Sequence, residues 1–382
     1  LFTVGLGQSF VFVLVPPLAR ELGLTVIQTS SVFAFSAIAW ALTSAFWGRA
    51  SDKYGRRNIA ILGLVGYAAS LIAMITPLFL VERNLLDVIW LFPLLMLGRS
   101  INGLLGSATR PAAFAYTADT SSRDNRTLKF ARLESSFLLG TVAGPLIGGF
   151  LILITKETPF YVFSLMALIA SIGIYKNLET DTAPQKVEIV SKISWFSDSV
   201  WPYLALASVA SLCQASLLQS IGFFITDSFS YLDDLLIITS ITFALLSISS
   251  IVSQYLFTDS FPLDNYKLLI SGTLLLVFSY FTMGFFSKIS VYYLSIIING
   301  FGAGMLRPAI ASSLSLSQTP ENQGSAAGYL GSVIPIGHIL TPLIAMPIYS
   351  INPAFLYYFS SLLCIGSILF IITHPIFKKS EI

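Results

Sequence analysis

The sequence predicts an all-α polytopic membrane protein, with 12 transmembrane helices arranged as two pseudo-symmetric six-helix bundles. The 382 residues are 55% hydrophobic and only 10% charged, too few charges to cover a soluble surface. Apolar runs of about 18 residues or more, enough to cross a bilayer, recur along the whole chain. These runs are continuous rather than alternating, which excludes a β-barrel.

One polar segment divides the apolar runs into six plus six. We expect an N-terminal six-helix bundle at 1–177, a cytoplasmic linker at 178–199 and a C-terminal six-helix bundle at 200–382. The first run begins at Leu1, so we expect further residues upstream in the native protein, and no cleavable signal peptide is recognised. The spans are expected at 1–19, 29–48, 58–82, 88–117, 131–154, 158–177, 200–226, 234–257, 266–286, 289–316, 327–350 and 353–374.

The positive charges give the orientation. Of the 21 Lys and Arg residues, fourteen fall in segments on one side of the membrane, four on the other and three inside spans. Because cytoplasmic loops carry the excess of Lys and Arg, both termini are expected in the cytoplasm of a cell with an inner membrane. The net charge of +2 gives no reason to expect a nucleic-acid partner. Cys213 and Cys364 lie inside spans, and no disulfide is expected.

The two halves repeat each other at an offset of 197 residues. Ile101-Asn102-Gly103 followed by Arg110-Pro111-Ala112 recurs as Ile298-Asn299-Gly300 followed by Arg307-Pro308-Ala309. The same offset maps Pro145-Leu146-Ile147 onto Pro342-Leu343-Ile344. Such a register indicates internal duplication, and substrate sites of duplicated transporters lie between the repeats.

A charged segment between the second and third spans carries a specific motif. Gly48-Arg49-Ala50-Ser51-Asp52-Lys53-Tyr54-Gly55-Arg56-Arg57 fits G-x-x-x-D-[RK]-x-G-R-[RK] at every fixed position. It resembles the loop between helices 2 and 3 of the major facilitator superfamily of secondary transporters. We expect a conformational latch here, with tight turning and close packing at the glycines and Asp119 as the partner of Arg56. The expected latch residues are Gly48, Asp52, Lys53, Gly55, Arg56, Arg57 and Asp119.

The fifth span is rich in glycine. Gly140, Gly144 and Gly148 lie four apart on one helix face, which allows another helix to approach closely. With Pro145 and Gly149 they form G-x-x-x-G-P-x-x-G-G, similar to the signature of the 12-helix drug:proton antiporter branch of this superfamily. The resemblance implies a hinge and export rather than import. An ordinary glycine packing seam is the simpler alternative.

A cation lies inside the fourth span. Leu95-x-x-x-Arg99-x-x-Asn102-Gly103 resembles a pattern of the same branch, in which this arginine is linked to proton coupling, although Asn102 replaces the usual Gln. A bare cation at mid-membrane costs about 3 kcal/mol or more, so Arg99 must face a partner or a polar cavity. Arg110 follows eleven residues later, about three turns, so we expect the two arginines to share one face about 16 Å apart.

Candidate site residues follow from these polar groups. Arg110 and its repeat-mate Arg307 suit an anionic substrate, or each pairs within its own half. The expected substrate-binding residues are Arg99, Arg110, Arg307, Asn102, Asn299 and Gln8, and the expected proton-coupling candidates are Glu134, His338 and Arg99. No metal site is expected, and no cofactor beyond the proton gradient.

The resemblance implies a proton-coupled exporter that works by alternating access. Its cargo is either a drug-like amphiphile or an anionic metabolite such as a carboxylate siderophore. We expect a monomer in the lipid bilayer whose partners are protons and a small-molecule substrate. An importer, and a non-transporting sensor on a transporter fold, are the alternatives. No pattern typical of an intramembrane enzyme is present.

Overall fold

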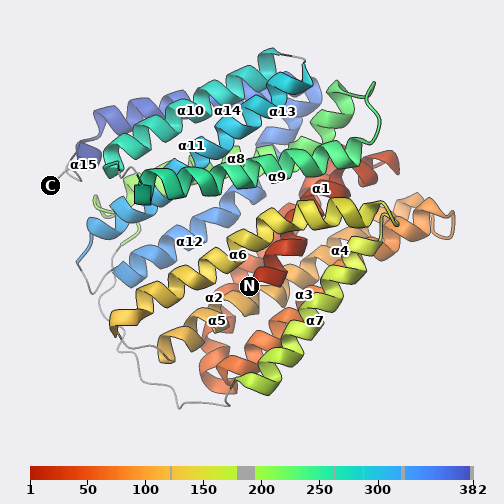
Figure 1. Ribbon diagram of the computed structural model, residues 1–382, viewed down its shortest axis with the longest axis horizontal. Helices are drawn as coiled ribbons and strands as arrows, with labels where there is room; N and C mark the ends of the chain where they lie inside the picture. Colours follow the sequence, from red (N-terminus) through yellow and green to blue (C-terminus); the bar gives the residue numbers. More distant parts are fainter. Residues whose placement is uncertain (121–122, 179–193, 261–262, 287, 320–322, 379–382) are drawn as a thin grey trace. The chain divides into compact units, whose positions relative to one another are not determined.

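The computed structural model describes residues 1–120, 123–178, 194–260, 263–286, 288–319 and 323–378. Its chain divides into two compact units, an N-terminal unit of Leu1–Val187 with Leu236–Ile241 and a C-terminal unit of Glu188–Leu235 with Thr242–Ile382. Most of the expected linker lies outside the described residues. Within the described residues, twelve helical stretches are long and apolar enough to cross a membrane, so the expected all-helical, 12-span fold is confirmed (Figure 1).

The N-terminal unit holds the first six spans. The fourth is built from two helices, α4 and α5. The helices are α1 (Phe2–Glu21), α2 (Val26–Tyr54), α3 (Arg56–Glu82), α4 (Leu91–Leu104), α5 (Thr109–Asp119), α6 (Arg123–Ile152) and α7 (Thr158–Asn177).

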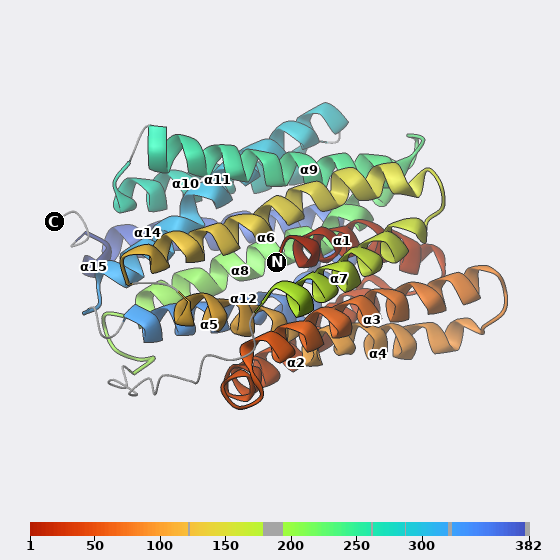
Figure 2. The same cartoon turned by 60° about the horizontal axis from the view of Figure 1, so that its bottom comes forward.

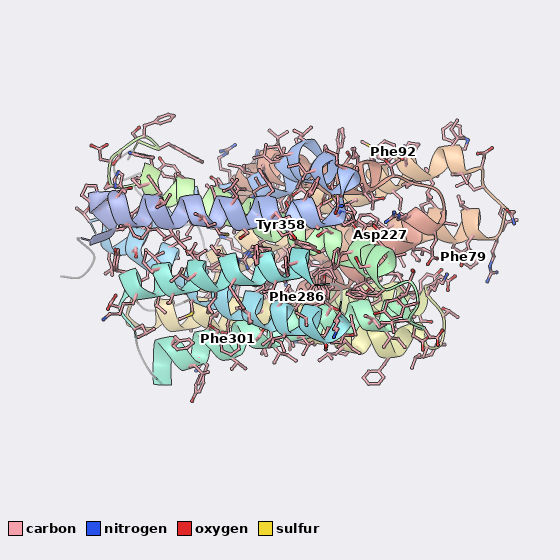
Figure 3. The ribbon with its side chains drawn as sticks, turned by 90° about the horizontal axis from the view of Figure 1, so that it is seen from above. Phe79, Phe92, Asp227, Phe286, Phe301 and Tyr358 are labelled. Atoms are coloured by element: carbon pink, nitrogen blue, oxygen red, sulfur yellow. The ribbon has the colours of Figure 1, made fainter. Side chains whose placement is uncertain are left out.

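The C-terminal unit holds the other six, except for Leu236–Ile241 of the eighth span, which belong to the N-terminal unit. Its eleventh span joins α12 to α13 through a π-helical turn at Thr341–Ala345. The helices are α8 (Trp201–Ser228), α9 (Leu235–Gln254), α10 (Asn265–Phe285), α11 (Ile289–Leu316), α12 (Gln323–Leu340), α13 (Met346–Ile351), α14 (Pro353–Thr373) and α15 (Pro375–Lys378). Within this unit Tyr358 of α14 lies against the end of α10, where its hydroxyl donates to the carbonyl oxygen of Gly284 at 3.0 Å (Figure 3).

Helices α1 and α6 pack backbone to backbone in the N-terminal unit, and their ribbons run side by side (Figure 2). A Cβ added at Gly140 would lie 2.2 Å from the carbonyl oxygen of Phe2, and one at Gly144 would lie 2.2 Å from that of Leu6. A Cβ at Gly148 would lie 2.2 Å from the ring of Phe10. The three glycines therefore form the close helix contact that their spacing predicts.

Close helix contacts at glycine also occur in the C-terminal unit. A Cβ at Gly337 of α12 would lie 2.3 Å from the carbonyl oxygen of Ser211 of α8. Gly103 of α4 abuts Ser36 of α2, and its repeat-mate Gly300 of α11 abuts Ser249 of α9. The repeated positions in the sequence thus occupy repeated positions within each unit.

The second span is longer than expected. Helix α2 continues to Tyr54, so the charged segment is its last turns and the turn itself is Gly55 alone, with φ 91° and ψ 136°. Since a side chain is strained at that φ, the glycine is required there. Gly48 lies in open space instead, and the close packing expected at that position is wrong.

The fourth span is broken where one continuous helix was expected. A 3₁₀ turn at Gly106–Ala108 separates α4 from α5. The break lies against glycines of α3: a Cβ at Gly66 would lie 2.3 Å from Cβ of Leu105, and one at Gly63 would lie 2.5 Å from the backbone nitrogen of Thr109. Tight packing on α3 therefore fixes this local change of helix geometry.

Candidate functional site

Arg99 lies in the core of the N-terminal unit, with a side chain only 3% exposed on α4. Its Nη2 donates to Oε1 of Gln8 on α1 at 3.2 Å. Its guanidinium carbon lies 5.6 Å from the ring centroid of Phe33 on α2, which is cation–π distance. Three helices therefore meet at this one cation.

The hydrogen bonding of Arg99 is incomplete. Its Nε and Nη1 are buried and have no hydrogen-bond partner among the described residues. Gln8 is neutral, so it supplies a hydrogen bond but no counter-charge. A buried guanidinium stays protonated, so the unit retains a positive charge at a free-energy cost. Such residues in membrane spans mark functional sites by default.

Asn102 lies one turn beyond Arg99 and is buried, as is its repeat-mate Asn299 on α11. Asn299 donates from Nδ2 to the Ser279 hydroxyl at 2.9 Å. In both asparagines Oδ1 is buried without a hydrogen-bond partner among the described residues. The offset of 197 maps Arg99 onto Ile296, so the charge exists in the first repeat alone.

Arg110 contacts aromatic rings of α5 and α6. The guanidinium of Arg110 lies 5.2 Å from the ring centroid of Phe137 on α6 and 5.9 Å from that of Phe114 on α5. A 3₁₀ turn at Gly106–Ala108 lies between Arg99 and Arg110, and their shared face stays a prediction. Arg307 on α11 is exposed.

Arg56 joins three helix ends, and its expected partnership with Asp119 is confirmed. Its Nε donates to Oδ2 of Asp119 on α5 at 3.0 Å. Its Nη1 donates to the Ser51 hydroxyl at 2.6 Å and forms an ion pair with Asp52. The side chain of Arg56 is 17% exposed and that of Asp119 is 25% exposed, so the contact is partly shielded from solvent.

Arg57 binds the end of α7. Its Nη1 donates to the carbonyl oxygens of Tyr175 at 3.4 Å and Leu178 at 3.2 Å, and its guanidinium lies 5.0 Å from the Tyr175 ring centroid. A cation at a helix C-terminus stabilises the helix dipole. Lys53 is exposed, with Nζ 5.2 Å from the ring centroid of Tyr54.

The expected hinge residues lie in α6, which packs on α1. Pro145 and Gly148 are buried, and Gly149 is half-buried. Helix α6 continues through Pro145 to Ile152. The same span contains the proton-coupling candidate Glu134, whose side chain lies outside the described residues. The other such candidate, His338, contacts Gln219 of α8.

Sequence reasoning missed the neighbours that hold these groups. Tyr67 of α3 is fully buried and donates to the carbonyl oxygen of Val4 at 3.0 Å. Gln219 is 1% exposed. A polar residue inside an apolar span was the available signal for Gln219, and for Phe33 no signal exists in the sequence.

The candidate spans among the described residues define a polytopic helical membrane protein. The family description "Major Facilitator Superfamily" matches residues 1–342. The chain therefore belongs to the major facilitator superfamily, a family of transporters and not of enzymes.

Two curated relatives are similar over nearly the whole chain. "Quinolone resistance protein NorA" of Staphylococcus aureus (strain MSSA476) is 26% identical over 365 residues, which are 92% of this chain and 88% of that protein. "Multidrug resistance protein 1" of Bacillus subtilis (strain 168) is 26% identical over 376 residues, 96% of this chain and 92% of that protein. The chain is a distant homologue of both proteins.

Solved structures show the same fold. A mutant of the nucleoside transporter NupG superposes with a TM-score of 0.74 at 11% identity, covering 99% of this chain and 98% of that one. The human organic anion transporter MFSD10 superposes with a TM-score of 0.68 at 17% identity, covering 97% and 96%.

Proposed function

We propose that this chain is a proton-coupled exporter of small drug-like molecules. The relatives named for quinolone and multidrug resistance support export, as does the G-x-x-x-G-P-x-x-G-G segment of α6. Alternating access converts the inward proton gradient into outward movement of cargo. Each proton that moves inward down 100 mV contributes about 2.3 kcal/mol.

The buried charge of Arg99 is the observation that carries this proposal. A protein that needed only a stable bundle would place an apolar residue there, as the second repeat does with Ile296. The free-energy cost of burying Arg99 beside Gln8 and Phe33 is explained if these residues bind the cargo or respond to the proton. A non-transporting sensor would have no need for this charge.

Export of an organic anion is the second candidate, and Arg307 favours it. Its side chain is exposed on a helix expected to span the membrane, where guanidinium can bind carboxylate in a bidentate manner. Arg110 supports it less, because this side chain already contacts two aromatic rings of its own unit. No residue favours a siderophore over other anions.

We further propose a monomer in the inner membrane with both termini in the cytoplasm. The charge bias supports this orientation. In this orientation Arg56 and its partners Ser51, Asp52 and Asp119, which we call the Arg56 cluster, lie on the cytoplasmic side. There the cluster stabilises one conformation, and its contacts break during transport.

Everted membrane vesicles test the cargo and the direction. We expect a pH gradient that is acidic inside the vesicles to drive uptake of ethidium and of a fluoroquinolone. The Arg110→Ala/Arg307→Ala double variant should retain most of this uptake. Uptake of a citrate-based siderophore alone, lost in the double variant, would establish the organic-anion alternative. Uptake of no cargo by a folded protein would contradict both.

A further inference from the structure

A polar contact joins α8 and α12 inside the C-terminal unit. Nε2 of Gln219 lies 3.1 Å from Nδ1 of His338. Nearby along the same two helices, the Ser216 hydroxyl lies 3.4 Å from that of Thr341. Gln219 is 1% exposed and His338 is half-buried. We call these four residues the α8–α12 polar contact.

The first repeat has no such contact at the matching positions that the structure describes. The offset of 197 maps three positions of α6 onto α12 and its π-helical turn: Thr141 onto His338, Gly144 onto Thr341 and Gly148 onto Ala345. In α6 the two glycines lie on α1, and the helix stays α-helical. Where side chains replace them, the chain adopts a π-helical turn. Such turns occur frequently at functional sites, and this one begins three residues after the histidine.

The contact pairs an amide with a ring that can either donate or accept. With the Gln219 amide nitrogen toward Nδ1 of His338, a neutral imidazole accepts the hydrogen bond and carries its own hydrogen on Nε2. A protonated ring carries hydrogens on both nitrogens, and two donors would then face each other. Gln219 would have to turn its amide to present Oε1. Because Gln219 is buried between helices, this turn changes which buried polar groups its amide can pair with beside the π-helical turn.

Few charged groups surround this histidine. In the described part of α12 and of the elements packed against it, α8, α11 and the π-helical turn, the charged side chains are Asp227 and Arg307. Asp227 lies near the end of α8, where its Oδ2 accepts from the Tyr349 hydroxyl at 2.7 Å (Figure 3). Arg307 lies on α11 and is exposed. The other ionisable residues of these helices are Tyr203, Cys213, Tyr292, Tyr293 and Tyr329, which are neutral at pH 7.

We propose that His338 is the proton-binding residue of the C-terminal unit, and that its protonation turns the Gln219 amide at the contact between α8 and α12. Imidazole titrates near neutral pH, which suits a group that must bind and release a proton in each cycle. The inference rests on the proposed proton-coupled export, for which it names the proton carrier.

Histidine NMR tests the titration directly, because the chain contains two histidines, His338 and His374. His374 follows α14, and His374→Gln leaves a single labelled ring. We expect the ring signals of His338 to titrate between pH 5 and 8, to report the Nε2–H tautomer at high pH, and to shift when ethidium binds. A ring that stays neutral at pH 5 would overturn the proposal.

Transport by variants tests the coupling. We expect His338→Gln to bind ethidium and to exchange it down a concentration gradient. Its uptake driven by a pH gradient should be at least tenfold lower than that of the wild type. His374→Gln, the matched control, should keep the driven uptake. Gln219→Met should keep a titrating ring but alter the pH profile of uptake. Full driven uptake by His338→Gln would overturn the proposal, and if this variant does not fold, the NMR titration of His374→Gln decides.

The two proposals can fail separately. If the wild-type protein carries ethidium without moving protons, proton-coupled export itself is wrong. If the wild-type protein is coupled and His338→Gln remains coupled, export stands and the assignment of the proton carrier to His338 is wrong.

Discussion

Arg99 shows how a single residue can cost stability and serve function. Its guanidinium has a hydrogen bond to Gln8 and a ring contact with Phe33. Neither supplies a negative charge. Replacing buried ionic groups by apolar ones of similar volume is often neutral or stabilising by about 1–4 kcal/mol. Stability alone therefore does not explain an arginine at this position.

Replacing Arg99 should separate these two effects. We expect Arg99→Met to melt in detergent at or above the wild-type temperature, because it removes a buried charge, while uptake driven by a pH gradient falls at least tenfold. Arg99→Lys keeps the charge but loses the planar fork, so we expect low uptake and no gain in stability. Thermal melting and vesicle uptake measure both quantities.

The opposite pattern would assign Arg99 a structural role. In that case Arg99→Met would unfold several degrees below wild type, and the uptake that remained per folded molecule would be unchanged. Gln8→Leu provides a second check, since it removes the hydrogen-bond acceptor of Nη2 and leaves the charge in place.

Some residue contacts could be read from the sequence and others could not. The pairing of Arg56 with Asp119 followed from opposite charges at neighbouring helix ends, and the structure confirms it. The ring contacts of Arg110 could not be foreseen, because they depend on which face α5 presents to α6. That face depends on the 3₁₀ turn before α5, which is set by packing on α3.

At the scale of elements, glycine determines how closely α1 and α6 approach. Gly140 and Gly144 bring their Cα atoms against backbone carbonyls of α1, and no side chain separates the two helices at these described positions. In membranes such contacts hold helices together, since burial of apolar surface gives little net gain in lipid.

A methyl group at Gly144 should force these helices apart. Its Cβ would lie 2.2 Å from the Leu6 carbonyl oxygen and 2.4 Å from the Ser9 hydroxyl. The backbone of α1 would have to move to relieve the first of these clashes. We expect Gly144→Ala to cost about 1–3 kcal/mol of stability, as overpacking does, and to reduce uptake. Melting in detergent measures the loss.

Gly173→Ala is the matched control, because nothing lies within 4 Å of a Cβ at that position of α7. It should melt at the wild-type temperature or slightly above, since alanine favours helix over glycine. Equal melting of the two variants would show that α1 and α6 do not depend on close contact.

The Arg56 cluster couples three elements, α2, α3 and α5. We expect a double-mutant cycle of Arg56→Gln and Asp119→Asn to give a coupling free energy of about 0.5–1 kcal/mol, because the pair is partly exposed. If the cluster also stabilises one transport conformation, each single variant changes the uptake rate more than its melting temperature. Strict additivity of the two changes would mean that the pair is not coupled.

The local changes of helix geometry within the fourth and eleventh spans could not be predicted from the sequence. Apolar runs gave the number and order of the spans, since a bilayer requires long helices. They could not give the 3₁₀ turn at Gly106–Ala108 or the π-helical turn at Thr341–Ala345. Both arise from side chains and glycines on neighbouring helices, which a hydropathy pattern does not report.

At the scale of the whole molecule, duplication supplied two similar units that have since diverged. Gly103 and Gly300 occupy matching contacts, and Asn102 and Asn299 are both buried. The first unit adds Arg99, and the second adds the α8–α12 polar contact. We infer that the two repeats have different roles in binding the proton and the cargo.

The orientation can be measured with single cysteines. In a background with Cys213 and Cys364, both buried, replaced by Ala, we expect Leu85→Cys to react with a membrane-impermeant maleimide in intact cells and Lys53→Cys to react only after lysis. Leu85 is 69% exposed and Lys53 is also exposed, so access to the reagent depends on the side of the membrane. The reverse result would invert the proposed topology.

Substrate-driven proton movement in proteoliposomes tests the central claim most directly. With a pH-sensitive dye inside the vesicles, an ethidium gradient should move protons in the opposite direction in wild type, and Arg99→Met should abolish this movement. Ethidium flux that leaves the internal pH unchanged, or equal proton movement in the variant, would contradict the account of this chain as a proton-coupled exporter that depends on a buried arginine.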